Sequence, residues 1–218
     1  MKLNNYKVIF LMADSVRSKY YLNEFKKKNF FFKHIIFLGK RKSFLKYKSK
    51  INKQTIFEHL NVNSINSKIA YKKINAAKNN LIFYSGFPGE KISKKILKTK
   101  NIFLHAHTRN LPKYKGSTTF YYSMIKDSHF YVSLMIINEN IDQGIILFKK
   151  KFVNFKNENK KLSIFEIKAR AKTFLDFMRN FKQKNIKFMK NNNHLITYYF
   201  IAHPIIRFFG QKKYEKQV

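Results

Sequence analysis

The sequence predicts an α/β fold, with a mostly parallel central sheet flanked by helices. Short apolar runs, typical of buried strands, alternate along the chain with segments whose apolar residues recur at helical spacing. The composition supplies a core, because 44% of the 218 residues are hydrophobic and 24 Phe and 13 Tyr are present. A chain of this length and composition is expected to fold rather than to remain disordered.

Each element of this alternation is predicted from its local pattern. Continuous apolar runs predict strands at Val8–Met12, Phe32–Leu38, Leu81–Tyr84, Ile102–His107, Tyr131–Ile137 and Ile145–Val153. Helical spacing predicts helices at Ser15–Phe25, Glu90–Leu97 and Ser163–Phe181, and a weaker helical pattern covers Thr55–Leu60 and Ile65–Asn75. The lysine-rich stretch Lys40–Lys53 shows little periodicity, which indicates a surface loop or a frayed helix.

The net charge of +35, from 46 Lys and Arg against 11 Asp and Glu, admits two interpretations. A polyanionic partner or a membrane surface would attract such a chain. The alternative is a solvated lysine surface of compositional origin, because Lys, Asn, Ile, Phe and Tyr are all plentiful and the lysines are scattered. The charge by itself therefore assigns no function.

Some classes of protein are excluded by what the sequence lacks. There is no cysteine, which excludes disulfides and thiolate metal sites. No apolar run approaches the ~20 residues of a membrane span, and Asp14 interrupts the short apolar run near the start. A cytoplasmic protein without a transmembrane segment is expected.

The segment Phe103–Thr119, FLHAHTRNLPKYKGSTT, departs from the rest of the chain. Alternate residues of a strand point to the same face, so His105 and His107 are expected to project together. Three interpretations are open: half-buried structural histidines, a His-x-His metal pair, or a general acid–base histidine tuned by a carboxylate. Asp142, in the loop NENIDQG between two predicted strands, is either that carboxylate or part of an ordinary Asp-x-Gly turn.

Sharp turns follow two of the predicted strands. Five of the nine Gly and Pro residues (6 Gly and 3 Pro) lie there, namely Gly86, Pro88, Gly89, Pro112 and Gly116. Ligands of open α/β sheets bind outside the carboxyl ends of strands, and glycine lets the backbone approach a ligand closely. These turns are therefore the expected rims of a site.

The stretch HAHTRNLPKYKG, followed further along by IDQG, resembles the folate-dependent formyltransferase family. That family comprises methionyl-tRNA formyltransferases, glycinamide ribonucleotide formyltransferases and amino-sugar N-formyltransferases. The resemblance is specific over Leu81–Val153 and implies a Rossmann-like formyltransferase fold. It implies that His107 and Asp142 are catalytic, and that His105 stands where the family has asparagine, as a second donor to the formyl oxygen.

The resemblance also implies the ligands and their contacts. The donor would be 10-formyltetrahydrofolate, and the residues implied to bind it are Ser85, Gly86, Phe87, Pro88, Gly89, Asn140, Ile141 and Gly144. The residues implied to bind the acceptor are Lys113, Tyr114, Gly116, Ser117, Thr118 and Thr119, of which the last three can also cap the following helix. No metal is expected, because the resemblance accounts for the histidines without one.

The acceptor is expected to be a primary amine of a nucleotide-linked amino sugar, as in surface polysaccharide synthesis. The segment MADSVRSKYY lacks the Gly/Ser-rich phosphate loop of the glycinamide ribonucleotide enzymes, and the chain ends before the barrel with which methionyl-tRNA formyltransferases grip tRNA. A formyl-folate hydrolase and a methionyl-tRNA formyltransferase-like enzyme are alternatives. From another class, the alternative is a non-catalytic basic protein bound to a membrane surface or a polyanion such as nucleic acid.

Residues 1–190 are predicted to form the formyltransferase-like catalytic domain, and 191–218 an aromatic and basic extension. The run Tyr198–Phe209 carries too much apolar area to leave in water. It is expected to pack on the catalytic domain or on a partner subunit of a homodimer, with the lysines after Gly210 exposed. An interfacial helix on a membrane is the alternative for this run.

Overall fold

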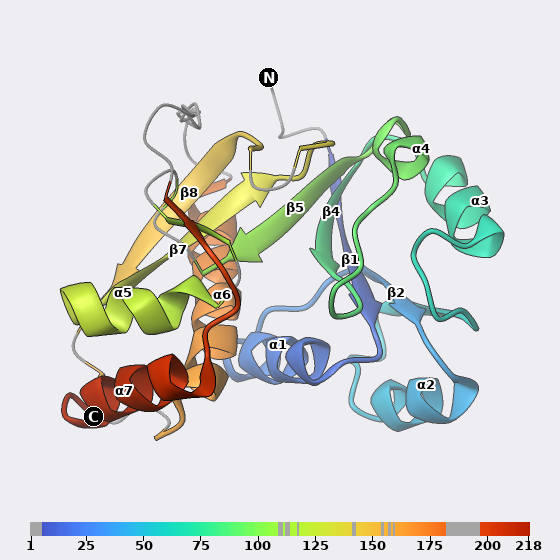
Figure 1. Cartoon of the computed structure of the whole chain (residues 1–218). Coiled ribbons are helices and arrows are strands. Elements are labelled where there is room, and N and C mark those ends of the chain that lie inside the picture. Colours follow the sequence, from blue (N-terminus) through green and yellow to red (C-terminus); the bar gives the residue numbers. More distant parts are fainter. Residues whose placement is uncertain are drawn as a thin grey trace. The chain divides into compact units, whose positions relative to one another are not determined.

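Figure 1 shows the computed structural model of the chain. The structure describes residues 6–108, 111, 114–116, 118–140, 143–153, 155–156, 158, 160–181 and 197–218, with the backbone alone at 114–116 and 197–198. Within these residues, seven strands form one sheet in the order β3-β2-β1-β4-β5-β7-β8. Neighbouring strands from β3 to β5 are parallel, and β8 runs antiparallel to β7. The predicted α/β class with a mostly parallel sheet is confirmed.

The elements follow one another in largely alternating order. The strands of the sheet are β1 (Lys7–Ala13), β2 (His34–Leu38), β3 (Ile56–Leu60), β4 (Asn80–Ser85), β5 (Ile102–His107), β7 (Phe130–Ile136) and β8 (Ile146–Phe152). The helices are α1 (Val16–Lys27), α2 (Arg41–Lys48), α3 (Lys68–Ala76), α4 (Lys94–Leu97), α5 (Thr119–Asp127), α6 (Leu162–Phe181) and α7 (Pro204–Glu215). Two short strands, β6 (Tyr114–Gly116) and β9 (Thr197–Tyr199), form a separate parallel pair.

The chain divides into two compact units. The first comprises Met1–His105 and Ile136–Ile141, and the second comprises Ala106–Met135 and Asp142–Val218. The division falls within β5, so the two histidines of this strand belong to different units.

In the first unit, alternation along β1 distributes the core to both faces of the parallel strands. The ring of Phe10 packs against Phe83 of β4 at 5.7 Å and against Tyr21 of α1 at 6.4 Å. Ile9 points to the opposite face and joins Ile74 of α3 in a second apolar cluster. Strands buried on both faces read as continuous apolar runs, which is why the sequence predicted β1 and β4.

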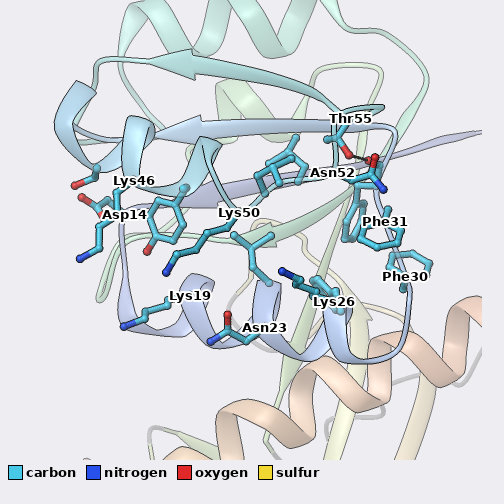
Figure 2. A pocket seen from close by; sticks show the side chains of 17 residues that line it. Asp14, Lys19, Asn23, Lys26, Phe30, Phe31, Lys46, Lys50, Asn52 and Thr55 are labelled. Carbon is cyan, nitrogen blue, oxygen red and sulfur yellow. Dashed lines mark hydrogen bonds between the residues drawn. The ribbon is translucent and has the colours of Figure 1, made fainter.

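A cavity of about 220 Å³ lies in the first unit between α1 and the segment from α2 to β3 (Figure 2). Phe32 and Tyr47 are among its apolar lining residues, and lysines extend along it from both sides, with Lys19 on α1 and Lys46 on α2. None of the site residues predicted from the sequence lines this cavity.

In the second unit, α6 packs against β8 through aromatic rings. The ring of Phe165 lies 5.8 Å from Phe130 and 5.9 Å from Phe152. Tyr214 of α7 stacks on the same Phe165 ring, 5.8 Å away. One buried ring on α6 therefore contacts two strands and the last helix of the chain.

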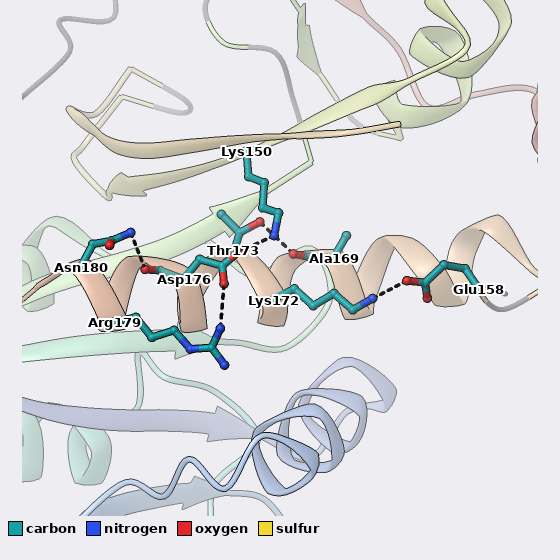
Figure 3. A network of polar contacts seen from close by, with 8 residues as sticks. All are labelled: Lys150, Glu158, Ala169, Lys172, Thr173, Asp176, Arg179 and Asn180. Carbon is teal, nitrogen blue, oxygen red and sulfur yellow. Dashed lines mark hydrogen bonds and ion pairs between the residues drawn. The ribbon is translucent and has the colours of Figure 1, made fainter. Parts of the chain in front are cut away.

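Ion pairs line another part of α6 (Figure 3). Lys172 pairs with Glu158 at 2.5 Å, and Asp176 pairs with Lys150 and, at 3.6 Å, with Arg179. Partly exposed pairs of this kind contribute about 0–1 kcal/mol each to stability. The aromatic core, rather than these pairs, therefore holds α6 in place.

The described part of the C-terminal extension packs within the second unit. The backbone of β9 pairs with β6, with Gly116 opposite Tyr199, and α7 packs along α5. The helices approach closely at Gly210, where an added Cβ would lie 3.0 Å from Cδ1 of Tyr121. The division into residues 1–190 and 191–218 nevertheless stays a prediction.

Two local predictions differ from the structure, and a third is decided between its alternatives. Thr55–Leu60, predicted to be weakly helical, contains the strand β3, which pairs in parallel with β2. The ring of Phe57 stacks on Phe44 of α2 at 4.6 Å, so long-range pairing overrides a weak local preference. For Lys40–Lys53, where a surface loop or a frayed helix was expected, the structure has the helix α2, none of whose residues is buried. Of the predicted helix Glu90–Leu97, only the last turn, α4, is helical.

The side chains of the extension are only partly covered within the single chain. Tyr214 and Gly210 are buried, but the large apolar residues before them are exposed, by 77% at Phe200, 58% at Ile205 and 57% at Phe208. In the part of the chain that the structure describes, no helix combines the length and apolar character needed to cross a membrane.

Candidate functional site

The loop that leaves β4 is held by the first turn of α1. The hydroxyls of Ser85 and Ser18 are both buried and lie 2.9 Å apart. Arg17 donates from Nη2 to the carbonyl oxygen of Gly86 at 2.8 Å. The side chain of Ser15 caps α1 by accepting a hydrogen bond from the backbone N–H of Ser18 at 3.2 Å. Two predicted folate contacts, Ser85 and Gly86, are thus fixed by α1 residues that the sequence did not single out.

Tyr84 explains why position 86 is a glycine. A Cβ on Gly86 would lie 1.9 Å from the hydroxyl oxygen of Tyr84 and 2.1 Å from its Cζ. Burial raises the pKa of this hydroxyl, Glu90 raises it further, and Arg17 opposes both. Among the described residues, the buried hydroxyl has no hydrogen-bond partner. It is therefore a neutral donor that abuts the loop.

Glu90 fixes the other end of the same loop. Its Oε1 accepts hydrogen bonds from the Ser64 hydroxyl and, at 3.0 Å, from the backbone N–H of Ile65. Asn66 adds a bond from its side-chain nitrogen to the carbonyl oxygen of Lys91 at 2.8 Å. The segment before α3 therefore anchors the loop that follows β4.

Between these two anchors the loop is open. Phe87 is half-buried, whereas Pro88 and Gly89 are exposed. Gly89 has φ +76°, and nothing lies within 4 Å of the position that a Cβ would occupy there. The left-handed backbone favours glycine at this position. Exposed backbone between fixed ends suits a flat ligand with hydrogen-bonding edges, so the residues fit the predicted folate.

The strand β5 carries the two predicted histidines. His105 and His107 are partly exposed, and Ala106 between them is buried, so the imidazoles share a face of the strand. The Nδ1 of His105 lies 3.4 Å from the carbonyl oxygen of Tyr84 on the neighbouring β4. Because a carbonyl oxygen only accepts, Nδ1 carries the proton in this contact, and the Nε2 of a neutral ring is then an acceptor.

The residues on either side of His107 are bonded to one buried ion pair. The hydroxyl of Thr108 donates to Oε1 of Glu166 and accepts from Nε of Arg170 at 2.9 Å. Nη1 of Arg170 also donates to the carbonyl oxygen of Ala106, at 3.4 Å. The two charged side chains pair directly, and only 5% and 12% of their areas are exposed. The sequence carried one signal for this pair, the i,i+4 spacing on α6, which does not reveal its partners on β5.

Leu111, from the predicted motif, anchors the loop that follows β5. It is buried with Met135 and Ile146 in a small apolar cluster. Its carbonyl oxygen accepts a hydrogen bond from Nζ of Lys149 on β8, at 3.0 Å. Burial lowers the pKa of Lys149.

Two of the predicted acceptor contacts make structural hydrogen bonds. The buried hydroxyl of Thr119 donates to the carbonyl oxygen of Thr108 at 3.0 Å. Thr118 is the N-cap residue of α5, with φ +54°, but its side chain does not cap the helix. Its Oγ1 instead accepts from the backbone N–H of Ala202 at 2.7 Å. A contact between these threonines and an acceptor stays a prediction.

Several predicted site residues lie outside the described residues, namely Asp142, Ile141, Lys113 and Ser117. Of their neighbours, Asn140 is exposed and Gly144 is buried, and the backbone of Tyr114 and Gly116 forms β6. No group of three His, Asp or Glu side chains among the described residues is placed to hold a metal ion. The expected absence of a metal stays a prediction.

Comparison by sequence finds no relative: no protein-family model and no curated protein matches this chain. Comparison by structure does find matches. A sugar N-formyltransferase from a Shewanella species has 13% sequence identity and a TM-score of 0.60, over 95% of this chain and 87% of that one.

Two further structures agree with this match. The N-formyltransferase from Helicobacter canadensis, solved with folinic acid and dTDP-3-aminofucose, is 17% identical with a TM-score of 0.62, over 96% of this chain and 80% of that one. A 4-N formyltransferase from Francisella tularensis is 14% identical with a TM-score of 0.56, over 98% and 88%. The fold implied by the motif resemblance is confirmed: this chain has the fold of the sugar N-formyltransferases.

Proposed function

We propose that this chain transfers the formyl group of 10-formyltetrahydrofolate to a primary amine of a nucleotide-linked amino sugar. The observation that carries the proposal is the position of the His-x-His motif in this fold. The motif ends β5, and β5 pairs with β4, whose exit loop is the predicted folate loop. A structure of this fold holds folinic acid and dTDP-3-aminofucose, which supports both the donor and the class of acceptor.

The loop from Ser85 to Glu90 would bind the folate ring through its exposed backbone. Its two ends are fixed by Arg17 and by Ser64, so little conformational entropy would be lost when the ring binds.

The chemistry requires an uncharged amine to attack the formyl carbon. The bond from that carbon to the folate nitrogen then breaks, and the amine's proton passes to that nitrogen. His107 would donate to the formyl oxygen as negative charge develops on it, or relay the proton, and Asp142 would orient the imidazole. The segment that leads to Asp142 leaves β7 beside β5, where the backbone N–H of Ile137 donates to the carbonyl oxygen of Phe103 at 2.8 Å.

His105 would supply the second donor that the family's asparagine provides. With Nδ1 directed at the carbonyl of Tyr84, a neutral ring has no proton on Nε2. Donation from Nε2 to the formyl oxygen therefore requires the imidazolium form. Hydrogen-bond donation by His105 would therefore depend on pH. Donation by the amide of an asparagine would not.

The proposal is tested by incubating the protein with 10-formyltetrahydrofolate and a panel of dTDP-linked amino sugars. Release of tetrahydrofolate and a formylated sugar, detected by mass spectrometry, is expected only with a matching amine present. The His107→Ala variant is the control, and its rate is expected to fall by about 100- to 1000-fold, the loss typical of one oxyanion donor.

Other outcomes would select the alternatives. Release of tetrahydrofolate without any amine would favour a hydrolase, and turnover only with methionyl-tRNA would favour the tRNA enzyme. No turnover with any of these acceptors would favour a non-catalytic basic protein. A cytoplasmic location and a homodimer remain part of the proposal, and sedimentation velocity would check the dimer.

A further inference from the structure

The outward surface of α7 carries an apolar patch, which we define as Ile205, Phe208 and Phe209. Their side chains are 58%, 57% and 56% exposed. They occupy positions i, i+3 and i+4 of the helix, so they lie on one face. Phe200 and Ile201, which lie four and three residues before the helix, are exposed by 77% and 66%. Large apolar side chains gathered in this way indicate a surface that contacts another phase or molecule.

The inward face of α7 fixes the direction of this patch. Tyr214 is fully buried, and Gly210 packs against Tyr121 of α5. Gln211 accepts from the backbone N–H of Leu162 at 2.9 Å and donates to the carbonyl oxygen of Lys160 at 2.7 Å. The helix cannot rotate to bury its outward residues without breaking these contacts.

The same helix also carries several exposed cations. Arg207, Lys212, Lys213 and Lys216 are all exposed on α7 and the residue after it. The ammonium of Lys212 lies 5.9 Å from the ring centre of Phe208. Glu215 is the single acid from Pro204 to Val218, and it accepts hydrogen bonds from Gln211 and Lys212, each at 3.0 Å. The local charge is therefore positive and continuous with the apolar residues.

This charge decides between occupants. A second copy of the chain would carry the same cations and a net charge of +35 to the contact, so like charges would meet. An anionic lipid surface offers negative headgroups to the lysines and an acyl boundary to the phenylalanines. We propose that α7 is an interfacial helix that docks this protein peripherally on anionic lipid bilayers, with Phe208 and Phe209 inserted at the level of the headgroups. The inference is independent of the formyl-transfer activity.

The test uses the absence of tryptophan from the sequence. Phe208→Trp places a single fluorescent reporter in the patch, and Phe31→Trp places one at a phenylalanine of the first unit that is 47% exposed. With vesicles of phosphatidylglycerol and phosphatidylcholine, we expect the Phe208→Trp emission to shift to the blue and to be quenched by brominated acyl chains. The Phe31→Trp emission is expected to do neither. Equal behaviour of the two reporters would overturn the proposal.

A protein with this net charge adsorbs to anionic vesicles by charge alone, so the binding measurement needs matched variants. The double variant Phe208→Ser/Phe209→Ser is expected to weaken cosedimentation with these vesicles by about 10-fold at physiological salt. Phe31→Ser/Leu45→Ser removes two exposed apolar residues elsewhere and is expected to leave it unchanged. Equal affinity of the two double variants would show adsorption by charge alone and contradict the proposal.

Two controls separate lipid docking from misfolding and from self-association. Circular dichroism and the melting temperature of Phe208→Ser/Phe209→Ser should match the parent, because neither side chain is buried. Sedimentation velocity without lipid compares the oligomeric state of the parent with that of this variant. A dimer of the parent that this variant converts to a monomer would assign the patch to a second copy and overturn the lipid proposal.

Discussion

The Nε of Arg170 donates to the hydroxyl of Thr108 at 2.9 Å, and Thr108 directly follows His107. The same guanidinium pairs with Glu166 and reaches the carbonyl of Ala106 on the other side of the histidine. The end of β5 is therefore held by a charged group on α6 that lies far from it in the sequence.

We predict that Arg170→Met destabilises the fold by about 3–5 kcal/mol, because it leaves the buried carboxylate of Glu166 without its charged partner. The proposed formyl transfer should also slow, since the backbone on both sides of His107 loses its anchor. Chemical denaturation and a transfer assay measure the two effects.

The matched control is Arg179→Met on the same helix. Arg179 is 66% exposed and pairs with Asp176 at 3.6 Å, so its loss should cost about 0–1 kcal/mol. An equal loss of unfolding free energy in the two variants would show that the buried Glu166–Arg170 pair matters no more for stability than the exposed one. Glu166→Leu/Arg170→Met should recover part of the stability, because no unpaired charge remains.

Because Tyr84 lies so close to Gly86, we predict that Gly86→Ala lowers the free energy of unfolding by about 1–3 kcal/mol through overpacking. In a Tyr84→Leu background the hydroxyl and ring carbon that meet the new Cβ are gone. A double-mutant cycle should therefore show positive coupling, with a smaller cost of Gly86→Ala in that background. Additive free energies of unfolding would refute a steric origin of this cost.

Tyr84→Phe alone should leave the free energy of unfolding unchanged or raise it, because the buried hydroxyl finds no partner among the described residues.

The contact of His105 with the carbonyl of Tyr84 predicts a pH dependence of the proposed activity. If the imidazolium supplies the second donor, its contribution is lost as rising pH removes the proton from Nε2. His105→Asn restores a donor that does not titrate. The ratio of kcat for His105→Asn to that of the parent should therefore rise with pH. A constant ratio would exclude His105 as a proton-dependent donor.

The lowered pKa of Lys149 predicts that the stabilities of the parent and of Lys149→Met depend differently on alkaline pH. Burial lowers its pKa below the ordinary value of 10.5, so the folded protein releases this proton before the unfolded chain does. Between the lowered pKa and 10.5 the unfolded chain binds more protons, and the stability of the parent should rise with pH relative to Lys149→Met.

The comparison for Lys149 uses Lys151→Met, which alters an exposed lysine of the same strand. Its free energy of unfolding, measured by urea denaturation from neutral to alkaline pH, should run parallel to that of the parent. A flat or falling difference between the parent and Lys149→Met would contradict the assigned burial effect.

The sequence by itself determined the elements whose patterns are local. Val8–Met12 and Leu81–Tyr84 read as apolar runs because β1 and β4 are covered on both faces, and Ser163–Phe181 reads as a helix because one of its faces packs on β8. The shared face of His105 and His107 followed from the period of a strand alone.

Only the tertiary structure decided the features that depend on residues distant in sequence. Thr55–Leu60 became strand because β2 offers it backbone partners, which no local pattern encodes. The anchors of the candidate site, Arg17 on Gly86 and Glu166 with Arg170 on Thr108, join segments 69 and 58–62 residues apart. The apolar residues of α7 were expected to be covered because they are hydrophobic. The helix has one inward face, however, and Gly210 and Tyr214 occupy it. Hydrophobicity sets how much surface a chain tends to bury, but which side chains are covered depends on where the neighbouring elements lie.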